Sequence, residues 1–286
     1  MSSPSTARGL LAFLLGLVAT ALLPVALAAH WADGVVASTS TYLGTVAPLA
    51  HDPAVQKVAE DRIGSAILHN LPTSVVTLGG AQVKDTVTTL THTVVHSDAF
   101  PAAWDAANTT AHQRLLSALQ DATPSDRDVT IPLSKVVDAV VAKLSPGGVH
   151  LGVKVPADAA SVTLLPGGET GKARLAYERL TAANTWLPGA TGAAAALALL
   201  VANRRFRALS WLGWGGALGG LAVPVLVTVF RQTTVTHADG TAPRAVRLAV
   251  WDALTHDLRH EGFVVAGIAA TVAVVASIVA WAVRRS

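Results

Sequence analysis

The chain has 286 residues, of which 51% are hydrophobic and 14% are charged, and its mean hydropathy is +0.48. This composition excludes one water-soluble domain of that size and indicates that part of the chain lies in lipid. The formal net charge of +3 is small and its arginines and lysines are mostly dispersed, which argues against nucleic-acid binding. The absence of cysteine excludes disulfides and thiolate sites.

The first predicted element is the uncharged run over residues 10–29, which follows a polar cytoplasmic N-terminus over residues 1–9. About twenty residues suffice to cross a bilayer as a helix. A cleaved signal peptide is the alternative, because small residues at 26–29 offer a cleavage site. The apolar run of a signal peptide is usually about 7–15 residues. We therefore expect a retained first transmembrane helix, and either outcome exports the next segment.

Residues 30–185 form a predicted extracytoplasmic domain whose first part is helical. Asp52 caps a helix predicted over residues 53–70, with Pro53 at its first position. Helical spacing predicts two more helices, over 83–94 and 97–121, although many threonines in the former favour a strand. The apolar stripes are Val55, Ala59, Ile63 and Ile67, then Val83, Val87, Leu90 and Val94, then Phe100, Trp104, Ala111 and Leu115.

The second part of this domain changes character after a polar loop at residues 122–127. A short strand is predicted over 128–132, an amphipathic helix over 134–144, and two strands over 149–155 and 161–165. Three short strands need a helix to cover one face. We therefore predict a small βαββ element, after which the chain becomes helical again and runs into the second span.

Three further transmembrane helices are predicted over residues 186–203, 209–230 and 263–283. The basic turn at 204–208 and the tail at 284–286 fall on the same side as Arg8 if both termini are cytoplasmic, as the positive-inside rule requires. The sequence thus predicts a multi-pass plasma-membrane protein with both termini cytoplasmic. The topology-setting residues are Arg204, Arg205, Arg207, Arg284 and Arg285.

Residues 231–262 form a second predicted extracytoplasmic loop that contains an amphipathic helix. Val246, Val250, Leu254 and Leu258 lie on one stripe of that helix. A helix lying along the membrane interface and a helix docked on the exported domain explain this stripe equally well.

This order of one span, a long exported domain and three more spans resembles a family of integral membrane proteins from high-GC Gram-positive (actinobacterial) bacteria. The resemblance covers nearly the whole chain. That family has no assigned activity, so the resemblance implies the architecture and supplies no catalytic residues. The segments that carry it are Thr45-Val46-Ala47-Pro48-Leu49-Ala50, Asp52-Pro53-Ala54-Val55, Ser97-Asp98-Ala99-Phe100 and Trp104 to Leu115.

Two histidine pairs, His92 with His96 and His256 with His260, stand four residues apart, a spacing that places two imidazoles on one helical face. Neither pair has the glutamate of a zincin motif, and the spacing identifies no third ligand. The sequence therefore predicts no metal, no cofactor and a stability that is insensitive to chelators.

No catalytic residue is identified. Residues 167–172 do not satisfy the phosphate-loop pattern and are interpreted as a turn before a helix, and the nucleophile-elbow motif is absent. The interiors of the four spans contain no ionisable residue, which argues against a coupled transporter. Four glycines in the third span predict close helix packing, within the chain or in a homodimer. These glycines are Gly215, Gly216, Gly219 and Gly220.

Trp104, Asn108 and His112 follow one another at four-residue intervals and form one stripe of a helix. Buried polar groups need partners, so either the three residues bond within the domain core or they line a ligand or partner groove.

The sequence thus predicts a membrane all-α protein of four transmembrane helices with a mostly helical α+β extracytoplasmic domain. The leading functional hypothesis is a non-enzymatic, envelope-facing interaction, scaffold or sensing module. The alternatives are an extracytoplasmic envelope hydrolase or transferase, and a subunit of an exporter or channel. The expected partners are the lipid bilayer, an envelope or membrane protein, and a second copy of the chain.

Overall fold

The computed structural model describes residues 4–121, 128–144, 155–156, 159–237 and 243–285. The chain forms two compact units. The span unit consists of Met1–Gly34, Tyr177–Ala238 and Thr255–Ser286. The core unit consists of Val35–Ala176 and Asp239–Leu254.

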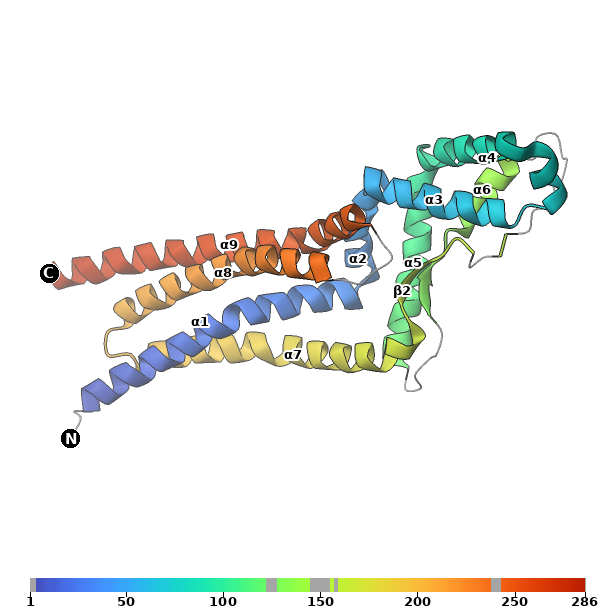
Figure 1. Ribbon diagram of the computed structural model, residues 1–286. Helices are drawn as coiled ribbons and strands as arrows, with labels where there is room; N and C mark the ends of the chain where they lie inside the picture. The colour runs from blue at the N-terminus through green and yellow to red at the C-terminus, as the bar shows by residue number, and fades with distance from the viewer. Residues whose placement is uncertain (1–3, 122–127, 145–154, 157–158, 238–242, 286) are drawn as a thin grey trace. The chain divides into compact units, whose positions relative to one another are not determined.

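Four long apolar helices supply the span unit, and all four are labelled in Figure 1. Each contains a stretch long and apolar enough to cross a membrane. Large apolar side chains point outward from them, and Trp211, Leu218 and Ile268 are 65%, 67% and 62% exposed. Such surfaces suit contact with lipid, so these helices fit a multi-pass membrane protein. They are α1 (Pro4–Ala37), α7 (Thr170–Val201), α8 (Arg205–His237) and α9 (Arg244–Arg285).

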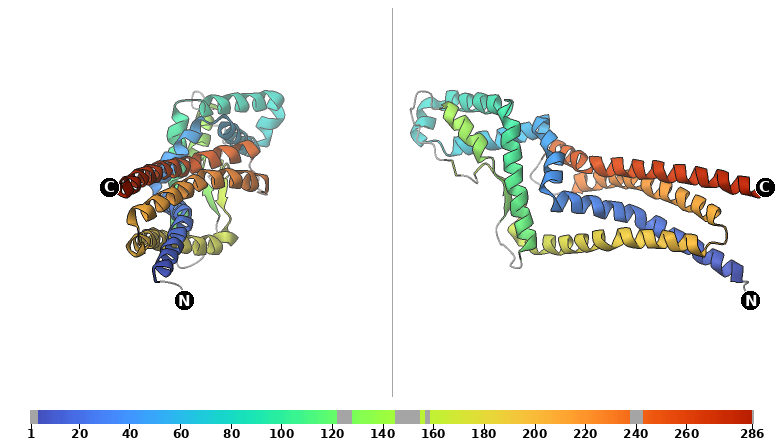
Figure 2. Two further views of the ribbon diagram at one scale, coloured as in Figure 1. Left: turned by 90° about the vertical axis from the view of Figure 1, so that its left-hand side faces the viewer. Right: turned by 180° about the vertical axis from the view of Figure 1, so that it is seen from behind.

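Within the span unit, the start of α1 and the end of α9 lie at the same end as the turn between α7 and α8 (Figures 1 and 2). Polar contacts join α1 to α7 near the opposite end. Asn184 Nδ2 donates to Asp33 Oδ2 at 2.8 Å, and Thr181 Oγ1 donates to Asp33 Oδ1 at 3.3 Å. These hydrogen bonds tie α1 to α7 at that end.

The four predicted packing glycines, which lie on α8, are in close contacts within the span unit. Gly215 and Gly219 approach α1, whereas Gly216 and Gly220 approach α9. The closest approach to backbone atoms is at Gly220, where an added Cβ would lie 2.7 Å from the backbone nitrogen of Ala266. Glycine is required there because backbone atoms of the neighbouring helix occupy the space of a side chain.

The core unit is mostly helical. In chain order its described elements are α2 (Thr39–Val46), the short 3-10 helix η1 (Ala47–His51), α3 (Pro53–His69), α4 (Thr73–Val95), α5 (Ala99–Gln120), β1 (Val129–Ile131), α6 (Ser134–Leu144), β2 (Val162–Leu165) and the 3-10 turn η3 (Gly167–Glu169).

The predicted cap and stripe of α3 are confirmed. Asp52 Oδ1 accepts hydrogen bonds from the backbone nitrogens of Ala54 and Val55 at 2.9 and 3.2 Å, which fixes the first turn. Ile63 and Ile67 are fully buried in the core. Burying a side chain of this size contributes about 1.5–3 kcal/mol.

The helix predicted over residues 83–94 is also confirmed as part of the longer α4. The hydroxyls of Thr86, Thr88 and Thr93 donate to backbone carbonyls four residues earlier, so the threonines are satisfied inside a helix despite their strand preference. Near its start α4 is broken at Gly80, whose φ of +49° favours glycine. The chain therefore changes direction after its first turns.

The βαββ prediction is supported only in part. β1 and β2 pair antiparallel, with Thr130 opposite Thr163 and Ile131 opposite Val162, and α6 lies between them in sequence. The third expected strand, over 149–155, falls almost wholly outside the described residues. Asp128 Oδ1 accepts from the Gly167 backbone nitrogen at 2.9 Å, which ties the two ends of this element together.

The amphipathic segment before the fourth span belongs to the core unit. It is continuous with that span in the single helix α9. Val246, Val250 and Leu254 pack against the buried core residues. Of the two interpretations left open by the sequence, these contacts favour docking.

Candidate functional site

Antiparallel packing of α3 on α4 brings together three potential metal ligands from distant parts of the sequence (Figure 1). Glu60 lies on α3, His92 lies on the last turn of α4, and His96 is the residue that caps the C-terminal end of α4. The candidate ligand atoms of the three side chains all lie within 4.8 Å of one another. We call this group the Glu60 cluster.

The two histidines of the Glu60 cluster are oriented together. Their rings stack, with centroids 4.2 Å apart and planes inclined by 29°. His96 Nε2 lies 3.0 Å from Glu60 Oε1. The side chains of His96 and Glu60 are 42% and 17% exposed, so an ion can reach them from solvent.

Two imidazoles and one carboxylate form a ligand set that proteins use for Zn²⁺ and for Fe²⁺. With bonds of about 2.0–2.2 Å, a tetrahedral zinc ion holds its ligand atoms roughly 3.3 Å apart. In the structure, His96 Nε2 lies 3.0 Å from Glu60 Oε1, and the candidate ligand atoms of all three residues lie within 4.8 Å of one another. Three protein ligands leave at least one coordination position open to water or another ligand.

Sequence reasoning identified the histidine pair of this cluster but missed Glu60. Sequence motifs for metal sites relate ligands that are a few residues apart, whereas Glu60 stands 36 residues before His96. For His256 and His260, which are exposed on α9, the described residues bring no third ligand close.

The stripe of Trp104, Asn108 and His112 lies on α5 and is buried. Trp104 Nε1 donates to the Val46 carbonyl at 3.0 Å, and Asn108 Nδ2 donates to the Trp104 carbonyl at 2.9 Å. Asn108 Oδ1 accepts from the Tyr42 hydroxyl at 3.0 Å. These contacts are those of a packed domain core.

His112 is the third residue of this stripe and, unlike the other two, carries a titratable ring that is buried. Its ring stacks on Tyr42 with centroids 4.4 Å apart, and its Nδ1 lies 3.1 Å from Thr39 Oγ1. Burial lowers the pKa of His112, although the backbone of Val35 and Val36 partly counteracts this effect. Burial also raises the pKa of Tyr42. Both rings are therefore held neutral near pH 7.

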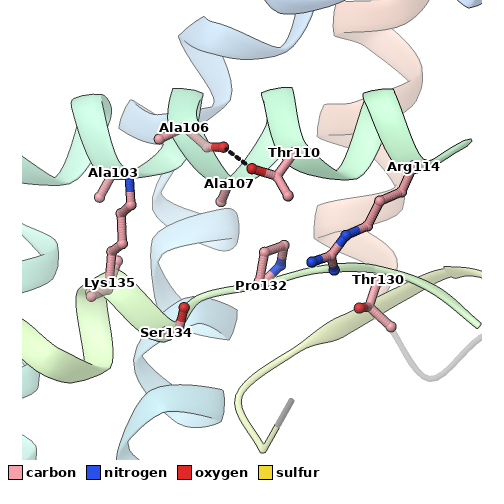
Figure 3. Close-up of a pocket in the computed structure, with 10 residues that line it drawn as sticks. Ala103, Ala106, Ala107, Thr110, Arg114, Thr130, Pro132, Ser134 and Lys135 are labelled. Carbon is pink, nitrogen blue, oxygen red and sulfur yellow. Dashed lines mark hydrogen bonds between the residues drawn. The ribbon is translucent and has the colours of Figure 1, made fainter. Parts of the chain in front are cut away.

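A separate cavity of about 290 Å³ lies between α5, β1 and the start of α6. Its lining carries two cations and several hydroxyls (Figure 3). Arg114 extends from α5 toward Thr130, and Lys135 extends from α6 toward Ala103. A cavity of this size and charge suits a small anionic group. It includes no residue of the Glu60 cluster.

The glycine-rich segment before α7 has the predicted role of a turn before a helix. Gly167–Glu169 forms η3, and the Thr170 hydroxyl donates to the Gly167 carbonyl at 2.6 Å. This contact shapes the start of α7.

Together, the four apolar helices and the helical core unit define a multi-pass helical protein with a candidate metal site. Comparison with known protein families, curated proteins and solved structures finds no match. The geometry of the chain itself is therefore the basis for a functional proposal.

Proposed function

We propose that this protein is a membrane-anchored, non-enzymatic sensing module of the cell envelope whose core unit binds a divalent transition-metal ion. The observation that carries the proposal is the convergence of Glu60, His92 and His96. A bound ion would link α3 to α4 through metal–ligand bonds and so stabilise this helix pair. Occupancy of the site would thus change the stability of the core unit, as a sensing role requires.

The proposal places the core unit outside the cytoplasm, in a plasma-membrane protein with both termini cytoplasmic. Its support is the distribution of basic residues. The turn between α7 and α8 and the end of α9 are rich in arginine, and the positive-inside rule assigns such segments to the cytoplasm.

Zinc titration of the full-length protein in mild detergent, against a chelating dye, tests the proposal. We expect one Zn²⁺ per chain. His92→Ala, His96→Ala and Glu60→Gln should each weaken binding by at least about tenfold, because each removes one of three ligands. Mg²⁺ should not compete, since it prefers oxygen ligands in octahedral geometry.

His69→Ala is the matched control. His69 lies on the same helix as Glu60, is exposed, and contacts the Ser65 carbonyl at 2.7 Å instead of the cluster. Absence of zinc uptake by the wild-type protein would overturn the proposal. The same conclusion would follow if His96→Ala bound zinc as tightly as His69→Ala.

A second candidate function is an extracytoplasmic metal-dependent hydrolase. The observation that favours it is the open coordination position, where a bound water would become a nucleophile. Hydrolysis of nitrophenyl esters or phosphates by the zinc-loaded protein, lost in His96→Ala and retained in His69→Ala, would support it. The solvent-exposed setting of the histidines supports binding without catalysis more strongly.

A further inference from the structure

An apolar groove of about 640 Å³ lies within the span unit. Its walls come from α1, the end of α7 and the first half of α8. Gly9 and Gly16 line it from α1, Ala198 from α7 and Trp211 from α8. Its volume falls in the range of sites that enclose most of a small ligand.

The groove has a basic end and an apolar remainder. Helices α1 and α8 run parallel, because Gly16 lies beside Leu212 and, further along both helices, Leu23 lies beside Gly219. The start of α1 is therefore level with the start of α8, where Arg204 and Arg207 line the groove. Beyond this end the lining is almost entirely apolar.

The few polar groups deeper in the groove do not alter its apolar character. Thr20 lines the far part, but its hydroxyl donates to the Gly16 carbonyl at 2.9 Å inside α1. Phe13 meets Trp211 edge to face, with ring centroids 6.3 Å apart. Apolar and aromatic surfaces thus continue from the basic end into the span.

The helix segments around the basic end supply no Asp or Glu to neutralise its arginines. The sequence contains no Asp or Glu in residues 1–32, 179–238 or 262–286. A guanidinium group pairs strongly with phosphate through two parallel hydrogen bonds. Basic pockets between transmembrane helices bind anionic lipid headgroups.

We propose that this groove binds one anionic phospholipid of the bilayer. The phosphate pairs with Arg204 and Arg207, and an acyl chain lies along the apolar part between α1 and α8. From Gly9 to Thr20 the helix rises about 16 Å, which accommodates most of a lipid chain. The inference requires the span unit to lie in a bilayer and is independent of the metal site.

Native mass spectrometry of the full-length protein in detergent tests this proposal. The probes are dioleoyl phosphatidylglycerol and dioleoyl phosphatidylcholine at equal concentration. We expect one tightly retained phosphatidylglycerol and at least tenfold less phosphatidylcholine. The double substitution Arg204→Gln with Arg207→Gln should reduce phosphatidylglycerol binding by about tenfold or more.

Two further variants separate charge from shape. Arg284→Gln with Arg285→Gln removes the same charge outside the groove and should leave binding unchanged. Ala12→Phe adds bulk to the groove wall and should weaken binding while keeping both lining arginines. Excess inorganic phosphate should not displace the lipid, because it lacks the acyl chain.

Equal retention of the two lipids would overturn the proposal. So would equal effects of the two arginine double substitutions. Displacement by inorganic phosphate would assign the basic end to a free anion and would equally contradict a lipid site.

Discussion

His96 Nε2 lies 3.0 Å from Glu60 Oε1, although 36 positions of sequence separate the two residues. The contact joins the C-terminal cap of α4 to α3, and the stacked ring of His92 adds a third candidate ligand beside the pair. Two helices that already pack together thus present a candidate set of three metal ligands. Metal binding should therefore act directly on the stability of the helix pair.

The first prediction is that Zn²⁺ stabilises the core unit. A ligand present at 100 times its dissociation constant raises the free energy of unfolding by about 2.7 kcal/mol. The melting temperature, followed by circular dichroism, should fall with EDTA and recover with zinc. This expectation differs from the chelator insensitivity that the sequence alone predicted. An unchanged melting temperature in EDTA, or a zinc response that persists in His92→Ala, would contradict it.

The second prediction concerns Trp104, which is 9% exposed and whose indole nitrogen donates to the Val46 carbonyl. Trp104→Ala should lower the free energy of unfolding of the core unit by about 3–5 kcal/mol, as the loss of a buried large aromatic does. Denaturant unfolding measures this change. Trp186→Ala is the control, because Trp186 is 75% exposed, and it should have little effect.

The third prediction tests whether Asn108 serves the core or a partner groove. Asn108→Ala should cost about 1–3 kcal/mol, because the Tyr42 hydroxyl and the Trp104 carbonyl lose their partner. Tyr42→Phe should be partly non-additive with it, since both remove the same hydrogen bond. An unchanged unfolding curve, combined with loss of a co-purifying protein, would support the groove instead.

The fourth prediction is a pH dependence caused by His112. Its pKa is lowered below 6.5 in the folded core, so the unfolded chain takes up a proton first as the pH falls. Stability from this group is complete above the unfolded pKa and is lost as the pH decreases through 6.5 toward the folded pKa. The slope contributed by one proton is at most about 1.4 kcal/mol per pH unit.

Unfolding measured in EDTA between pH 7.5 and 5 tests the role of His112 without bound metal. His112→Gln should lose part of the slope, and His69→Ala should keep it. Identical slopes in the wild-type protein and His112→Gln would show that other groups cause the pH dependence.

The fifth prediction concerns membrane topology. Reporters that work only outside the cytoplasm should be active when fused near residue 120 or 240 and inactive near residue 206 or after residue 286. The physical reason is the retention of arginine-rich segments on the cytoplasmic side. Fusions of a reporter that works only in the cytoplasm should give the opposite pattern. Cytoplasmic activity at residue 120 would refute the orientation.

The sequence by itself predicted four apolar helices, since length and hydropathy are local properties. It did not give their limits, because α1, α7 and α9 continue well beyond the predicted spans. The sequence also predicted α3, which Asp52 caps, and α5, whose buried stripe begins at Phe100. Both signals are local, because the residues that give them lie close together in the sequence. The strand preference of threonine near residue 88 was overridden, because its hydroxyls bond to the helix backbone and Val87 is buried.

Only the tertiary structure decided the candidate metal site. In a simple hairpin with a turn near residue 71, Glu60 would face residues near 82. The break at Gly80 diverts the first turns of α4, so the part of α4 that returns along α3 brings His92 and His96 to Glu60 instead. The tertiary structure likewise decided that Gly215 and Gly219 of α8 contact α1, whereas Gly216 and Gly220 contact α9. Contacts of this kind depend on backbone direction and helix register over tens of residues, which local periodicity does not encode.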